Sequence, residues 1–274
     1  MTRREDIGKD KRREQITSII KKEQSVRTIR LAEEFGVSRE VILKDMMALE
    51  KEGILVRVRG GAVLYNTGKE KPFSLRRTDH AREKEKISKI VTSQIEDGSV
   101  IFLTNSTTNL YVASYLEMKK NLTIFTNSLD IMNLMKDSRH RLVIIGGMYY
   151  PKGRHMIGSY AEEMIRNVYF DYSIFSMDGC LGMSGPGTNE VESHGFSNLV
   201  FRNSRRRILV SDQSKLDISA NYQVSEFRNF DVIVMDLLTP EHRRQFIEEN
   251  KADPDKLLEV QLFKDQFSSE KNES

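Results

Sequence analysis

The sequence predicts an α/β protein of two domains, an N-terminal winged helix-turn-helix followed by a Rossmann-like, mostly parallel sheet. Near the N-terminus, two short helical patterns precede a hairpin pattern. Further on, apolar runs typical of strands alternate with helical patterns, as in a parallel sheet that helices cover on both faces. With 274 residues, the chain is long enough to bury a sizeable core.

The helix-turn-helix is predicted on either side of the turn 36–38. Ser38 stands where its hydroxyl can accept from the first free N–H groups of the second helix, and Gly53 is expected to end that helix. Apolar residues recur at helical spacing in both helices. The residues predicted to pack the helices together are Leu31, Ala32 and Phe35 in the first and Ile42, Met46 and Leu49 in the second.

A wing is predicted after the second helix, because two β-prone runs within 54–65 flank Arg59-Gly60-Gly61. In such a module the helix 39–52 lies in a DNA major groove and the wing arginines lie near phosphates. The expected partner is double-stranded DNA; the alternative is a helical hairpin and a β-hairpin used for protein contacts. The residues expected to contact DNA are Ser38, Arg39, Glu40, Val41, Leu43 and Lys44 of the helix and Arg57, Arg59 and Gly60 of the wing.

Charge is distributed unevenly along the chain. Residues 1–95 contain 23 basic and 15 acidic side chains, a net +8, and residues 96–274 contain 20 and 25, a net −5; together they give the overall +3. A basic N-terminal part attracts polyanions through counterion release, and an acidic remainder does not compete for them. This asymmetry supports DNA binding.

The predicted organisation has four segments: the winged helix-turn-helix 1–66, a linker 67–81, a ligand-binding α/β domain 82–263 and a disordered tail 264–274. The linker is polar, charged and interrupted by Gly68 and Pro72. In the α/β domain, strands are predicted at 100–103, 122–125, 142–145, 172–176, 208–210, 232–235 and 258–262, and helices at 82–96, 108–116, 129–136, 159–168, 191–203 and 240–250.

Small and polar residues follow five of these strands. Ligands of open parallel sheets bind outside the carboxyl ends of the strands, so these residues predict a site for a small anion. Lys215 would supply positive charge to a phosphate, and Asp178 or Asp212 would accept from sugar hydroxyls. The expected ligand contacts are Thr104, Asn105, Ser106, Thr107, Thr108, Asn127, Gly147, Asp178, Gly179, Asp212 and Lys215.

Composition excludes several other functions. The single cysteine, Cys180, excludes an internal disulfide and a multi-thiolate metal cluster, and the five histidines have no ligand-like spacing. We therefore expect no metal and no cofactor. No apolar run approaches the length of a membrane span and the start lacks an apolar signal region, so we expect a cytoplasmic protein without a membrane partner.

The motifs together resemble the DeoR family of bacterial transcriptional repressors. In the N-terminal part the resemblance is carried by LAEEFGVS at 31–38, DMMALEKEG at 45–53 and RVRGGAV at 57–63. In the rest it is carried by EK at 83–84, IEDG at 95–98, STT at 106–108, TNS at 126–128, GG at 146–147 and DQSK at 212–215. The resemblance implies a sensor domain similar in fold to ribose-5-phosphate isomerase and CoA transferases. It also implies a repressor of sugar or nucleoside metabolism genes that a phosphorylated sugar controls.

This chain departs from the family pattern on both expected binding surfaces. The recognition helix reads VILKD at 41–45 where the family usually has Thr-Ile-Arg-Arg-Asp, so Leu43 replaces an arginine that would pair with guanine. In the sensor, Thr104, Ser106 and Ser176 replace a usual Asp, Gly and Gly, and the stretch around His194-Gly195 and Asn198-Leu199 lacks the usual Glu-Ala and Lys-Arg pairs. These changes predict an altered operator and an altered or lost effector.

Two other functions compete with this interpretation. The sensor fold resembles isomerases that use a carboxylate base, for which Asp178, Glu190 or Glu192 would be the candidates, but no pair has diagnostic spacing. The change at Leu43 also permits an adaptor that has lost specific DNA binding. We favour a regulator that is not an enzyme and that forms a homo-oligomer, a dimer or tetramer, because paired half-sites require at least two copies.

Overall fold

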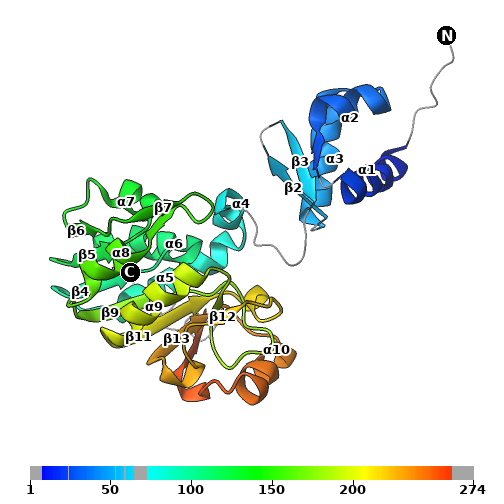
Figure 1. Ribbon diagram of the computed structural model, residues 1–274. Helices are drawn as coiled ribbons and strands as arrows, with labels where there is room; N and C mark the ends of the chain where they lie inside the picture. Colours follow the sequence, from blue (N-terminus) through cyan, green and yellow to red (C-terminus); the bar gives the residue numbers. More distant parts are fainter. Residues whose placement is uncertain (1–7, 24, 53, 59, 65–72, 261–274) are drawn as a thin grey trace, which may run out of the picture. The chain divides into compact units, whose positions relative to one another are not determined.

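The computed structural model describes residues 8–23, 25–52, 54–58, 60–64 and 73–260 (Figure 1). Contacts divide the chain into two compact units, Met1–Lys71 and Pro72–Ser274. The predicted tail 264–274, much of the predicted linker, Gly53 and Arg59 lie outside the described residues.

The first unit combines helices with a three-stranded antiparallel sheet of order β1-β3-β2. Its elements are α1 (Lys9–Glu23), β1 (Ser25–Arg27), α2 (Thr28–Phe35), α3 (Arg39–Lys51), β2 (Leu55–Val58) and β3 (Gly61–Leu64). The helix-turn-helix and the wing are therefore present as predicted. Helix α1 and strand β1 were not predicted, because α1 is strongly polar and places only Arg12, Ile16 and Ile20 in the interior.

The core of the first unit forms where three helices meet the sheet. Side chains at the predicted packing positions Leu31, Ile42 and Met46 are fully buried, and Ile16 and Ile20 of α1 join the same cluster. The turn between α2 and α3 is stabilised at both ends. Gly36 adopts a left-handed conformation after α2, and the Ser38 hydroxyl accepts from the N–H of Val41 at the start of α3.

Two arginines of α1 hold α3 in place through one buried carboxylate. Asp45 of α3 is only 2 % exposed; its Oδ2 accepts from Nε of Arg12 at 2.6 Å and its Oδ1 from Nε of Arg13 at 3.1 Å. A buried carboxylate without these partners would cost several kcal/mol. The pairing fixes the position of α3 against α1.

The wing joins the helices through a close backbone approach at Gly61. This residue pairs with Arg27 of β1, and a Cβ atom here would lie 2.0 Å from the carbonyl oxygen of Val26. Only glycine allows β1 and β3 to come this close. In addition, the N–H of Thr28, the first residue of α2, donates to the carbonyl of Gly60 at 3.0 Å.

The second unit is built on a seven-stranded, entirely parallel sheet of order β14-β13-β11-β9-β4-β5-β6. Its strands are β4 (Val100–Leu103), β5 (Thr123–Thr126), β6 (Arg141–Ile144), β9 (Phe170–Phe175), β11 (Ser204–Ser211), β13 (Val232–Met235) and β14 (Leu257–Glu259). Its helices are α4 (Phe73–Thr78), α5 (Ala81–Ser93), α6 (Thr107–Tyr115), α7 (Leu129–Met135), α8 (Ser159–Ile165), α9 (Val191–Arg202) and α10 (Pro240–Arg244), the last of which continues as a π-helical turn Gln245–Glu249.

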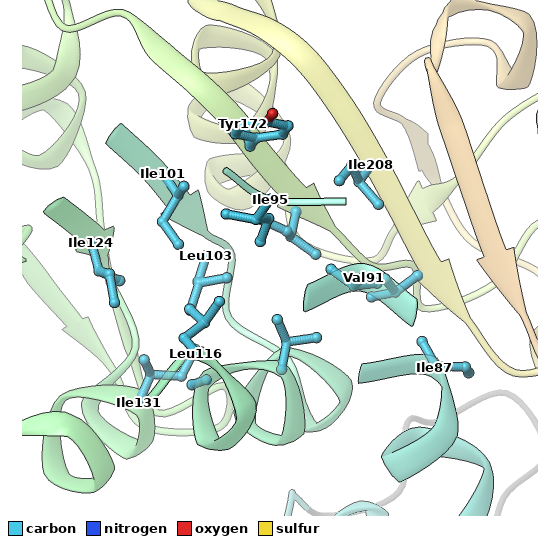
Figure 2. Close-up of a cluster of buried hydrophobic side chains, with 14 of the residues drawn as sticks. Ile87, Val91, Ile95, Ile101, Leu103, Leu116, Ile124, Ile131, Tyr172 and Ile208 are labelled. Carbon is cyan, nitrogen blue, oxygen red and sulfur yellow. The ribbon is translucent and has the colours of Figure 1, made fainter. Parts of the chain in front are cut away.

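Helices cover both faces of this sheet (Figure 1). On one face, α5, α6 and α7 bury an aliphatic cluster; Figure 2 shows Ile87 and Val91 of α5, and Ile95 just after it, beside the strand residues Ile101 and Ile208. On the other face, α8, α9 and the segment around Phe246 bury a cluster rich in phenylalanine. The predicted doubly covered parallel sheet is confirmed.

Three segments of the second unit differ from the prediction. Helix α4 forms inside the predicted linker 67–81. An antiparallel hairpin of β7 (Met148–Tyr150) and β8 (His155–Ile157) follows β6. A second antiparallel pair joins β10 (Gly187–Thr188), which precedes α9, to β12 (Tyr222–Gln223), which follows β11. These strands have two or three residues each, which is too short for an alternating pattern to be recognised. Within the described residues, no helix combines the length and hydropathy needed to span a membrane.

Candidate functional site

The outward face of α3 carries charge and apolar surface together. Arg39, Glu40 and Lys44 are exposed, and Leu43 and Met47 expose 41 % and 46 % of their surface. Of the other residues predicted to contact DNA, Ser38 is exposed at the start of the helix and Val41 is half-buried. Large apolar side chains at this exposure on a helix whose opposite face is buried indicate a contact surface.

The wing arginine Arg57 is already engaged by α3. Its backbone N–H donates to Oε1 of Glu50 at 2.9 Å and its Nε donates to Oε2 at 2.8 Å, with about a third of the side chain exposed. Arg57 therefore links the wing to the recognition helix. Contact of its remaining N–H groups with a phosphate stays a prediction. Gly60 is exposed at the wing tip, and Arg59 lies outside the described residues.

In the second unit, the predicted ligand residues gather because their strands are neighbours. Thr104 and Asn105 follow β4, Asn127 follows β5, Asp178 follows β9 and Asp212 follows β11, and these four strands are adjacent and parallel. Their carboxyl ends therefore lie along one edge of the sheet. Gly147 follows β6, the next strand beyond β5.

The turn after β4 is fixed by its own hydrogen bonds. The Thr104 hydroxyl donates to the carbonyl of Ile174 at 3.0 Å, and Ser106 caps α6 by accepting from the N–H of Asn109 at 2.9 Å. Thr107 and Thr108 are buried in the first turn of α6. Asn109, which was not predicted as a site residue, is fully buried and donates to the carbonyls of both Thr104 and Ile174.

A buried lysine that the site prediction missed lies among these strand ends. Lys84 of α5 is 3 % exposed, and its ammonium donates to the carbonyls of Arg76 and Asp79, the latter at 2.7 Å. Burial lowers the pKa of Lys84 to about 8, and the nearby Asp212 carboxylate opposes this shift. Lys215 lies close enough to Lys84 to act on it electrostatically, so two cations and the Asp212 carboxylate share this region.

Two carboxylates order the loop after β11. Asp212 accepts from the backbone N–H and the hydroxyl of Ser214, and Asp236 at the end of β13 accepts from the N–H of Gln213 at 2.6 Å. Burial, with a smaller contribution from the negative charge of Asp212, raises the pKa of Asp236 to about 6, and the hydrogen bond from the Gln213 N–H opposes this shift. Asp236 was not predicted, although it follows its strand just as Asp212 follows β11.

The β7–β8 hairpin and α9 bring a histidine to the same edge. His155 of β8 is buried and contacts Asn105 after β4 and Ser193 of α9. Burial lowers the pKa of His155, while the nearby carboxylates of Glu190 and Asp178 act in the opposite direction. Asp178 itself accepts from the N–H of Asn189 at 2.9 Å. Isolated histidines gave no signal in the sequence, because their partners come from other elements.

Two predicted ligand residues have a packing role in this structure. A Cβ atom at Gly147 would lie 2.7 Å from the carbonyl oxygen of Ile157, and one at Gly179 would lie 2.1 Å from that of Ile218. Close packing thus accounts for glycine at both positions, and their contact with a ligand stays a prediction. Burial raises the pKa of the Cys180 thiol to about 12, so this side chain is an unreactive packing residue at neutral pH.

The described residues contain no group of three or more His, Cys, Asp or Glu side chains placed to hold a metal ion. What they do contain is a winged helix-turn-helix with an exposed recognition face and a parallel α/β domain with polar strand ends. This combination defines a ligand-responsive DNA-binding regulator.

Comparison with known proteins identifies the family. The family model of the DeoR-like helix-turn-helix domain matches residues 12–67, and the family model of the DeoR C terminal sensor domain matches residues 79–237. The chain belongs to the DeoR family of transcriptional repressors, as its motifs predicted.

Curated relatives match over most of their length. The glycerol-3-phosphate regulon repressor of Escherichia coli (strain K12) is 30% identical over 82% of this chain and 90% of its own. The HTH-type transcriptional repressor GlcR of Bacillus subtilis (strain 168) is 27% identical over 81% and 86%. Among solved structures, ribose 5-phosphate isomerase A from Methanocaldococcus jannaschii aligns with a TM-score of 0.38 at 16% identity, covering 50% of this chain and 55% of that one. The curated relatives named here are repressors and not enzymes, which goes against the isomerase alternative.

Proposed function

We propose that this protein represses genes of carbohydrate metabolism by binding paired operator half-sites as a homo-oligomer, and that a phosphorylated sugar controls this binding. Family membership carries the repressor function, and the exposed face of α3 supplies the surface that enters the major groove. A relative named for the glycerol-3-phosphate regulon supports a small phosphorylated effector.

The ligand site is proposed at the carboxyl ends of β4, β5, β9 and β11. Lys215 and Lys84 provide positive charge for a phosphate, and the side-chain amides and hydroxyls after β4 and β5 provide neutral hydrogen-bonding groups. This division of charged and neutral groups suits a molecule with a phosphate at one end and hydroxyls at the other.

Helix α4 is proposed to carry the ligand signal. It follows directly after residues 65–72, which connect the two units along the chain, and the Lys84 ammonium holds the carbonyls of Arg76 in α4 and of Asp79. A phosphate near Lys84 and Lys215 competes for the same ammonium. A ligand changes DNA affinity only if it binds the DNA-competent arrangement more or less tightly than the incompetent one, and this competition supplies such a difference.

DNA binding is tested by fluorescence anisotropy of the full chain on its own upstream DNA across a range of salt. Arg39→Ala combined with Lys44→Ala is expected to weaken binding by at least tenfold and to reduce the salt slope by about 2, since each phosphate contact contributes about 0.9. Lys86→Ala with Lys136→Ala removes the same charge from exposed positions of the second unit and is expected to leave binding unchanged. Equal binding by the two double variants would contradict the assigned surface.

Effector control is tested by adding glycerol 3-phosphate, fructose 6-phosphate or ribose 5-phosphate to the protein–DNA complex. At least one is expected to change the DNA affinity, and Lys215→Ala is expected to remove this response while leaving ligand-free DNA affinity intact. If Lys215→Ala responds as the wild type does, the phosphate is bound elsewhere.

A further inference from the structure

A chain of hydrogen bonds links Asn105 to the start of α9. Asn105 Nδ2 lies 2.9 Å from the carbonyl of Gly153 and 3.0 Å from Nδ1 of His155. Nε2 of His155 lies 3.2 Å from the hydroxyl oxygen of Ser193, and that hydroxyl lies 2.8 Å from Oε2 of Glu190. Three segments distant in sequence thus meet in one line of hydrogen bonds at the edge of the sheet.

The donor and the acceptor of each hydrogen bond in this chain follow from Glu190, the residue at its end. The Glu190 carboxylate only accepts, so the Ser193 hydroxyl donates to it and accepts from Nε2–H of His155. Burial lowers the pKa of His155 and favours the neutral ring, whose Nδ1 is then an acceptor for the Asn105 amide. Both N–H groups of Asn105 are therefore used, one by Gly153 and one by His155.

This arrangement leaves the carbonyl oxygen of Asn105 without a partner. Its Oδ1 is buried and has no hydrogen-bonding group among the described residues. Asn127 is in the same state: its Nδ2 donates to the carbonyl of Met156 at 2.9 Å, and its buried Oδ1 has no partner in the described chain. Leu103 pairs with Thr126, so Asn105 and Asn127 follow neighbouring strands at nearly the same level. An unsatisfied buried acceptor destabilises the folded chain, and a ligand that donates a hydrogen bond to it would remove this cost.

We infer that Asn105, held by His155, Ser193 and Glu190, forms with Asn127 the part of the ligand site that accepts hydrogen bonds from the hydroxyls of a phosphorylated polyhydroxy compound. The inference rests on the proposed function and names the group that selects the ligand. The two amide oxygens only accept hydrogen bonds, so they repel a phosphate and attract hydroxyl donors. Around His155 the Glu190 and Asp178 carboxylates reinforce this preference, and the Arg76 guanidinium opposes it. The phosphate itself belongs on the Lys84 and Lys215 side. Asn105 and Asn127 touch the ligand, and His155, Ser193 and Glu190 are positioning residues.

The packing at Gly153 shows how closely this line is built. A Cβ atom there would lie 2.3 Å from Nδ1 of His155. Gly153→Ala must therefore displace the imidazole ring from Asn105, without altering any group that contacts the ligand. It offers a way to disturb the orientation of Asn105 without changing any side chain of the chain of hydrogen bonds.

The test uses calorimetry to measure the affinity of the 274-residue chain for inorganic phosphate and for glycerol 3-phosphate, fructose 6-phosphate and ribose 5-phosphate. The readout is selectivity, the affinity for the tightest hydroxylated probe divided by that for inorganic phosphate. Asn105→Leu is expected to reduce selectivity roughly tenfold, as loss of a hydrogen bond worth about 1.4 kcal/mol would do. Ser193→Ala and Gly153→Ala are expected to reduce it severalfold, and Ser193→Thr, which keeps the hydroxyl, is expected to restore it.

The matched control is His140→Asn. His140 is a second buried histidine with both ring nitrogens hydrogen-bonded, but its partners, the N–H of Leu122 and the carbonyl of Leu116, lie at the opposite ends of the strands. This variant is expected to lower the melting temperature and leave selectivity unchanged. Melting curves without ligand verify that every variant is folded, and Ser193→Ala, the mildest change, decides the outcome if Asn105→Leu does not fold.

The outcomes separate this inference from the proposed function. If the wild type binds no hydroxylated probe more tightly than inorganic phosphate, the proposed effector class and the inference both fail. If the wild type is selective and Asn105→Leu and Ser193→Ala retain that selectivity within twofold, the proposed function stands and the inference is overturned. Reduced selectivity with unchanged phosphate affinity, restored in Ser193→Thr, supports it.

Discussion

In the first unit, most side chains proposed to contact DNA are exposed on α3, and the buried charges of Arg12 and Asp45 hold that helix. In the second unit, three of the groups proposed to contact the ligand, Lys84, Asn127 and Asp212, are themselves buried. DNA is a large polyanion that an exposed surface attracts over a distance. A small molecule needs groups with fixed direction and little competing water, so the two units use burial for different purposes.

The largest effect is expected from Asp45→Ala. This variant leaves Arg12 and Arg13 without their shared carboxylate and is expected to destabilise the first unit by about 3–5 kcal/mol, since it strands a buried charge. Denaturant unfolding of the full chain, with hydrogen exchange of α3, measures the loss. Arg30→Ala removes an exposed pair with Glu23 and is expected to change nothing measurable. A loss as small as that of Arg30→Ala would show that Asp45 does not organise the helix.

The next largest effect is expected from Gly61→Ala. The added methyl group would overlap the carbonyl of Val26, so β1 must separate from β3 at a cost of about 1–3 kcal/mol. Gly8→Ala, where a Cβ atom meets nothing within 4 Å, is the control in the same unit. Thermal unfolding compares the two, and equal melting temperatures would mean that the strands adjust without strain.

A smaller effect is expected from Lys84→Met, and it concerns response rather than stability. Without the ammonium, α4 loses its link to the strand ends, so the change in DNA affinity caused by a phosphorylated sugar is expected to fall by about tenfold, or 1.4 kcal/mol. Ligand-free DNA affinity is expected to stay the same. Anisotropy titrations with and without ligand measure both, and a response equal to that of the wild type would remove α4 from the mechanism.

The smallest effect is expected from Asp236→Asn and depends on pH. The folded-state pKa of Asp236 is raised to about 6 from the ordinary 3.8, so between these values the folded protein binds more protons than the unfolded chain. This group therefore stabilises most below pH 3.8, and its contribution is lost as the pH rises through about 6. The melting temperature of the variant relative to wild type is expected to increase by at most a few °C from pH 4 to pH 7. A difference that does not vary with pH would contradict the raised pKa.

The sequence predicted the elements whose patterns are local. The turn 36–38, the wing and the strands of the parallel sheet were all recognised, because helical spacing, capping and apolar runs lie within short windows. Helix α1 was missed, since its stability rests on Ile16, Ile20 and the ion pairs to Asp45 rather than on its own pattern. Hairpin β7–β8 was missed because its strands are too short to alternate.

The candidate site was predictable only where a residue directly follows a strand. Asn105, Asn127 and Asp212 were identified in this way, and Asp236 follows the same rule after β13. Lys84 was part of a family motif, but neither Lys84 nor His155 could be placed at the strand ends, because α5 and β8 reach them only through tertiary packing. The positioning role proposed for Ser193 depends on its contact with His155, which lies 38 residues away in the sequence.

Strand β1 ends at Arg27 and helix α2 begins at Thr28, with no residue between them, and Thr28 is hydrogen-bonded to Gly60 beside the wing. Sheet and helix therefore share one continuous stretch of backbone. Amide protons of α2 and of β3 should exchange with deuterium at the same rate under native conditions, as in a single cooperative folding unit. We therefore expect the helix-turn-helix and the wing to open together rather than separately.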